Sequence, residues 1–135
     1  MPIVRITMAK GKSAAYLAAV SDSIYEAMVE KFDLPAGDKF HIFEQLDFGS
    51  FVYDRDYASP DQRTDDFMVI SVISDARRAA EKTATFEAIC RKLGLSPGVK
   101  PQDVMVHFIT VSTREDFSLG YGISAATTAD GTESC

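Results

Sequence analysis

The apolar residues of the first third of the chain change their spacing twice. Alternation of apolar and polar residues predicts a strand over 2–8. Apolar steps of three and four then predict a helix that is capped by Ser13 and ends near residue 33. A second strand is expected over 40–46, after a proline- and glycine-containing exit. The helical stripe consists of Leu17, Val20, Ile24, Met28 and Phe32.

The same order of elements returns further along the chain. Residues 67–74 form a continuous apolar run that predicts a strand, and residues 103–111 predict another. The helix between them is marked by Phe86, Ile89, Cys90 and Leu93. We therefore interpret 2–46 and 67–111 as duplicated strand–helix–strand halves within a single domain, residues 1–135.

Two such halves predict an α+β fold. Right-handed βαβ units placed side by side form a mixed four-stranded sheet with both helices on one face. The strands are apolar on both sides, so the second face of the sheet lacks a cover within the chain. We expect an oligomer to bury that face.

Composition limits the possible partners. The formal net charge is −6 and the isoelectric point is about 4.8, which gives no support to a nucleic-acid partner. No apolar run approaches the roughly 20 residues of a membrane span, so no membrane role is expected. The two cysteines show no metal-ligand spacing. Without a secretory pattern at the start, the sequence predicts a cytoplasmic protein.

Pro2 is an unusual residue with which to open a strand, because proline donates no hydrogen bond to a sheet. If Met1 is removed, Pro2 becomes a free secondary amine at the edge of the sheet. Ordinary terminal amines titrate near pH 7.7–8.0, so a modest shift decides whether such a group is an acid or a base. Pro2 is therefore a candidate catalytic residue.

A second candidate site is expected at the start of the second helix. Arg77 and Arg78 are expected in its first turn, where the helix dipole disfavours cations by up to about 1 kcal/mol. Such a departure often marks a site, here one for a carboxylate or phosphate. Alternatively, the two arginines extend into solvent or pair with Asp75 or Glu81. Asp75 itself is predicted to be the helix N-cap.

Together these features resemble the tautomerase superfamily. The resemblance covers roughly residues 2–125 and rests on the amino-terminal proline, the two βαβ units and the segments "FDLPAGDKF" and "VISDARRAAEK". Long single-chain members similar to malonate semialdehyde decarboxylase match best. The resemblance implies a homotrimer, no metal or organic cofactor, and a catalytic proline at Pro2.

The same resemblance implies roles for four further residues. Asp38 matches the aspartate beside the proline, Arg77 matches one of two carboxylate-binding arginines, and Phe117 matches an aromatic pocket wall. Asp75 stands where the decarboxylases have their other arginine, so this chain departs from their pattern. Arg78 and Asp75 remain additional candidates for substrate contact.

The sequence thus predicts an enzyme that acts on a small 2-oxo or 3-oxo acid by keto–enol tautomerisation. Pro2 is the expected acid or base, Arg77 the expected carboxylate ligand, and Asp38 the residue that sets the charge of Pro2. Decarboxylation or hydration, as in malonate semialdehyde decarboxylase, is one alternative. A non-enzymatic ligand-binding module is another, because a fold does not fix a function.

Overall fold

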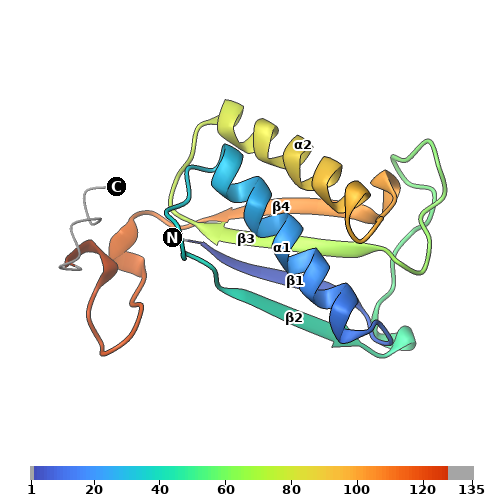
Figure 1. Cartoon of the computed structure of the whole chain (residues 1–135), viewed down its shortest axis with the longest axis horizontal. Coiled ribbons are helices and arrows are strands. Elements are labelled where there is room, and N and C mark those ends of the chain that lie inside the picture. The colour runs from blue at the N-terminus through green and yellow to red at the C-terminus, as the bar shows by residue number, and fades with distance from the viewer. Residues whose placement is uncertain (1, 128–135) are drawn as a thin grey trace.

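The duplicated order of elements is confirmed in a computed structural model, which describes residues 2–127 (Figure 1). Its four strands form one mixed sheet in the order β2-β1-β3-β4. The central pair β1–β3 is antiparallel, and the outer pairs β1–β2 and β3–β4 are parallel. The elements are β1 (Ile3–Ala9), α1 (Ala14–Lys31), β2 (His41–Leu46), β3 (Met68–Ser74), α2 (Ala79–Leu95) and β4 (Val104–Thr110).

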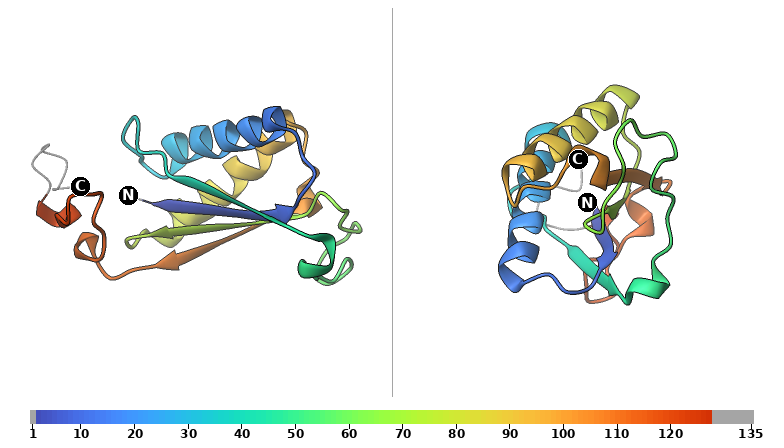
Figure 2. Two further views of the ribbon diagram at one scale, coloured as in Figure 1. Left: turned by 90° about the horizontal axis from the view of Figure 1, so that it is seen from below. Right: turned by 90° about the vertical axis from the view of Figure 1, so that its right-hand side faces the viewer.

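Both helices cover the same face of the sheet, as the sequence predicts (Figures 1 and 2). The core lies between these layers. Alternate residues of the central strands point into it and are almost completely buried, and the helices contribute an apolar stripe from α1 and a shorter one from α2. The largest fully buried side chains include Phe32, Ile6, Ile24, Met28, Met68, Ile70, Ile89 and Leu93.

The two helices begin by different means. Ser13 caps α1 as predicted, and its side chain accepts a hydrogen bond from the Tyr16 N–H. The predicted start of α2 is wrong: the helix begins at Ala79, and its N-cap is Arg78, not Asp75. Glu81 accepts hydrogen bonds from the Arg78 N–H and Nε at 3.2 and 3.1 Å, which supports this cap. Arg77 therefore precedes the helix.

Most of the opposite face of the sheet is uncovered among the described residues, and only its end near Val69 and Met105 adjoins the rings of Phe51 and Tyr53 from the long connection. Isoleucines from three neighbouring strands, Ile3, Ile73 and Ile109, lie level with one another on this face. A polar band follows, in which Arg5 Nε lies 3.3 Å from Glu44 Oε2 and Ser71 Oγ lies 2.5 Å from His107 Nε2. We call this surface the open face. The sequence predicts an uncovered apolar face; the face is largely uncovered, but these polar residues interrupt its apolar ones.

No helix within residues 2–127 is long and apolar enough to cross a membrane.

Candidate active site

The strand register sets Pro2, at the start of β1, beside the end of β3 and the residues that precede β2. Ile3 pairs with Ile73 across the antiparallel strands, so Pro2 lies level with Ser74 at the end of β3. Across the parallel pair β1–β2, the same offset places Pro2 level with Lys39. Pro2 is buried. Figure 2 shows this end of β1 beside the segment that follows β4.

Asp38 lies in the turn that leads from α1 to β2. Its N–H donates to the Pro35 carbonyl at 3.2 Å, and the preceding Gly37 N–H donates to the Tyr25 hydroxyl at 2.8 Å. Gly37 has a φ of 86°, a backbone conformation that glycine adopts without strain. The turn is thus fixed to α1, and it holds partly buried Asp38 one residue before the position level with Pro2.

Asp75 and Arg77 form an ion pair directly after β3. Arg77 Nη1 lies 2.6 Å from Asp75 Oδ1, and the two side chains are only 16% and 21% exposed. The guanidinium also stacks on Phe32, 4.4 Å from the ring centroid. Phe32 is fully buried and stacks in turn on Phe108. Arg77 is therefore held in place by a carboxylate on one side and an aromatic ring on the other.

A pocket of about 410 Å³ opens beside this ion pair. Because β3 and β4 are parallel, the residues that follow them meet at the same edge of the sheet. Asp75 and Ala76 form one side of the pocket. The other side consists of Ser112, Thr113, Arg114, Glu115 and Ala126.

The sequence reasoning did not single out Arg114 and its neighbours. No pattern of spacing marks the segment 112–116, and only the parallel pairing of β3 with β4 brings it to Asp75. Arg114 Nη2 donates to the Ala125 carbonyl at 3.2 Å, which ties the end of the described chain to this pocket. The topology is therefore the signal that could have revealed these residues.

Of the predicted site residues, Asp75 lines this pocket, whereas Pro2, Asp38, Arg77, Arg78 and Phe117 are not among its lining residues. The Arg78 side chain is 83% exposed and pairs with Glu81. Phe117 is buried, and its carbonyl accepts a hydrogen bond from the Ala125 N–H at 2.8 Å. The structure contains the alternative that the sequence offers: Arg77 pairs with Asp75, and Arg78 pairs with Glu81.

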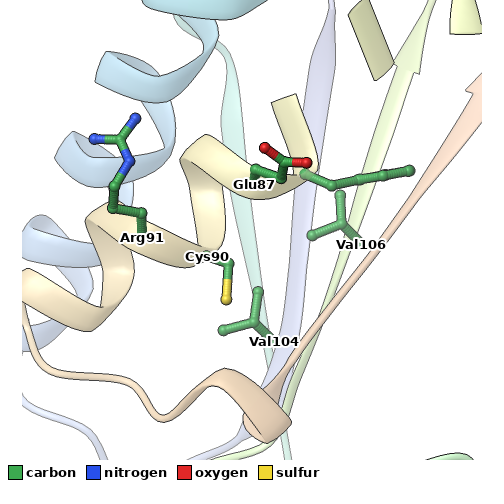
Figure 3. A pocket seen from close by; sticks show the side chains of 6 residues that line it. Glu87, Cys90, Arg91, Val104 and Val106 are labelled. Atoms are coloured by element: carbon green, nitrogen blue, oxygen red, sulfur yellow. The ribbon is translucent and has the colours of Figure 1, made fainter. Parts of the chain in front are cut away.

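A larger cavity of about 590 Å³ lies elsewhere, between α2 and the first half of β4 (Figure 3). Cys90 points toward Val104 on its apolar floor, whereas Arg91 points toward α1 and pairs with Glu30 at 3.0 Å. The cavity reaches Val106 and β4 ends at Thr110, so about 13 Å of strand separate this cavity from the Pro2 end. Because of this position and its lining, we assign the cavity no role in chemistry at Pro2.

The fold defines a class of protein. Residues 38–120 match the family model described as a tautomerase enzyme, and the chain belongs to this family. It is a member of the tautomerase superfamily, as the sequence predicts.

Individual relatives extend over nearly the whole chain. The probable tautomerase YusQ of Bacillus subtilis (strain 168) is 29% identical over 123 residues, which are 90% of this chain and 95% of that protein. A malonate semialdehyde decarboxylase described with decarboxylase and hydratase activities superposes with a TM-score of 0.84 at 26% identity, covering 90% of this chain and 92% of the other. A fused 4-OT, a symmetric trimer, has the same fold, with a TM-score of 0.72 at 17% identity over 91% and 95% of the chains.

Proposed function

We propose that this tautomerase-family enzyme uses the amine of Pro2 as acid or base in the keto–enol tautomerisation of a small 2-oxo or 3-oxo acid. The observation that carries the proposal is the strand register, which sets Pro2 level with Ser74 and Lys39. Asp75 directly follows Ser74, and Asp38 directly precedes Lys39. This register supports a role for the two carboxylates in controlling the charge of an amine at Pro2.

In this proposal Arg77 binds the substrate carboxylate. Its hydrogen bonds within the described chain, to Asp75 and the Ala76 carbonyl, both use Nη1. A guanidinium has five N–H donors, so its remaining edge can bind a carboxylate while Nη1 stays with Asp75. The stack on Phe32 fixes the plane of that edge.

Asp38 and Asp75 set the charge state of Pro2. A carboxylate near an amine stabilises the protonated form and raises the pKa of the amine. A protonated Pro2 polarises a substrate carbonyl, which suits decarboxylation or hydration next to that carbonyl. The similarity to malonate semialdehyde decarboxylase and the two carboxylates favour this chemistry as the second candidate function.

We also propose that the chain assembles as a homotrimer. The open face exposes Ile42, Met105 and Ile109 of the two edge strands by nearly half each, and such exposed apolar residues on one face favour an interface. Association of three copies removes this surface from water. The symmetric trimer of the fused 4-OT provides an example of such an assembly in the same fold.

The test of the catalytic role compares two chains that differ only before Pro2. One carries a free Pro2 after removal of Met1, verified by intact mass, and the other carries a Gly-Ser extension that turns the proline nitrogen into an amide. The extension is expected to lower the tautomerisation rate of an aryl-substituted 2-oxo acid, followed by ultraviolet absorbance, by about 10²- to 10⁴-fold. Equal rates above that of the uncatalysed reaction would exclude the amine mechanism, and rates no faster than the uncatalysed reaction in both chains would favour a binding module.

Covalent labelling gives an independent reading. A 3-bromopropiolate ion inhibits the FG41 malonate semialdehyde decarboxylase, which is 26% identical to this chain. With a free Pro2, peptide mapping after treatment is expected to place the label on Pro2. The extended chain, which has the same remaining residues, is the matched control and is expected to stay unlabelled.

A further inference from the structure

The charged groups at the pocket beside Asp75 include no excess of cations. Two carboxylates, Asp75 and Glu115, and one guanidinium, Arg114, line it. Arg77, which contacts Asp75 at 2.6 Å, adds a positive charge, and Asp116, which accepts hydrogen bonds from Ser112 and Thr113, adds a negative one. A pocket built to hold anions by charge alone would carry an excess of cations. Here Asp75, the carboxylate nearest to the proposed substrate-binding arginine, compensates its charge.

The Asp75–Arg77 contact is well shielded from water. Each side chain is about one-fifth exposed or less, and Phe32 covers one face of the guanidinium. Charges in such surroundings interact more strongly than they do in bulk water, where the effective dielectric constant is near 80. A substrate carboxylate that approaches Arg77 therefore meets the repulsion of Asp75 as well as the attraction of the arginine.

We infer that Asp75 is a specificity-determining residue: by compensating the charge of Arg77, it weakens the binding of anions and restricts the pocket to substrates with a single carboxylate and otherwise neutral groups. The inference rests on the proposed function for the location of the substrate. The contact of Asp75 with both the pocket and Arg77 carries it. A residue that merely oriented Arg77 would have the opposite effect when replaced.

The test measures how Asp75 affects the binding of two ligands of nearly equal shape. Pyruvate carries one negative charge, and methyl pyruvate carries none. Their dissociation constants are measured from the shifts of backbone amide resonances of Ser112 and Thr113 in the full chain. Asp75→Asn keeps an oxygen that accepts from Arg77 but removes the charge. It is expected to tighten pyruvate binding by about tenfold and to leave methyl pyruvate binding unchanged.

Two further variants separate charge from position. Asp75→Ala removes the charge and the hydrogen bond together, and it is also expected to improve pyruvate binding relative to methyl pyruvate. Asp61→Asn removes the same charge from an exposed loop at the opposite end of the sheet and is expected to change neither ligand. Raising the salt concentration should reduce the gain from Asp75→Asn.

The inference is overturned if Asp75→Asn leaves the pyruvate-to-methyl pyruvate ratio unchanged, or if it weakens pyruvate binding. These measurements use no reaction at Pro2, so they are separate from the test of the catalytic role. If Asp75→Asn changes the ratio of pyruvate to methyl pyruvate binding but 3-bromopropiolate does not label Pro2, the role of Asp75 stands and the proline mechanism is rejected. If Pro2 is labelled but the ratio does not change, the proline mechanism stands and the role of Asp75 is rejected.

Discussion

His41 is a partly buried histidine at the start of β2, on the face of the sheet that the helices cover. Its Nδ1 lies 2.7 Å from the Ser21 hydroxyl of α1. Burial lowers the pKa of His41 to about 4, and the nearby Lys39 ammonium acts in the same direction, whereas Asp22 opposes it. The folded protein therefore keeps this ring neutral.

The folded protein is therefore expected to become less stable as the pH is lowered. Between about pH 6.5 and pH 4 the unfolded chain binds a proton at His41 that the folded chain does not, so the free energy of unfolding decreases as the pH is lowered. Because the ring is partly exposed, we expect a loss on the order of 1–2 kcal/mol, measured by urea unfolding. His41→Gln should flatten this dependence.

The control for that experiment is the other histidine of the chain. His107 lies on the open face, where it contacts Ser71. In a His107→Gln variant His41 remains, so the slope between pH 6.5 and pH 4 should persist. A slope that survives in His41→Gln would show that other groups cause it.

Single residues show where sequence reasoning succeeds and where it stops. Pro2 could be selected as a candidate because proline is an unusual residue with which to open a strand, which is visible in the sequence. The Asp75–Arg77 pair could be foreseen only as one alternative, since residues two apart after a strand can point in several directions. Its shielding depends on Phe32, which is 45 residues from Arg77 in sequence and arrives there through the packing of α1.

At the scale of elements, periodicity was sufficient for all four strands and for the start of α1. It failed at the start of α2, where Asp75 is the better capping residue by intrinsic preference. In the structure the Asp75 carboxylate is engaged by Arg77, and Glu81 supports a later start instead. Local propensity could not reveal this competition, because it concerns which partner a side chain takes.

The long connection between β2 and β3 is joined to β4 by one buried carboxylate. Asp103 is fully buried and accepts hydrogen bonds from the Thr64 N–H at 2.7 Å and the Thr64 hydroxyl at 2.6 Å. Asp103→Ala leaves both donors without this acceptor and is expected to lower the free energy of unfolding by about 2–4 kcal/mol. Chemical denaturation monitored by circular dichroism measures the loss.

A milder variant tests whether the hydrogen bonds cause that loss. Thr64→Val removes the hydroxyl but keeps the shape and the N–H, so we expect a smaller cost of about 1–2 kcal/mol. In the double variant the two effects should be less than additive, because they share one interaction. Additive losses would mean that Asp103 acts through other contacts.

At the scale of the whole molecule, the open face leads to a prediction about assembly. Ile109 is 44% exposed and lies on that face, beside Ile73 of the neighbouring strand. In Ile109→Lys the ammonium reaches water in the separated chain but is buried on association, at a cost on the order of 3 kcal/mol per copy. Sedimentation equilibrium is expected to show trimers for the unaltered chain and monomers for the variant.

Leu95→Lys is the matched control for assembly. Leu95 ends α2, is 80% exposed and lies away from the open face. The same change of residue type there should leave the trimer intact. Dissociation of both variants, or of neither, would contradict the assignment of the open face as the interface.

The two halves of the chain have corresponding strand starts, and only one of them begins with a proline near a chain end. Pro2 opens β1, whereas the corresponding residue before β3 is Phe67. Phe67 is buried and packs against Phe51 and Tyr53, with ring centroids 5.8 and 4.5 Å away. Under the proposed function, duplication of the unit has therefore doubled the scaffold without doubling the reactive centre. The proposed trimer contains six strand–helix–strand units but provides three amines.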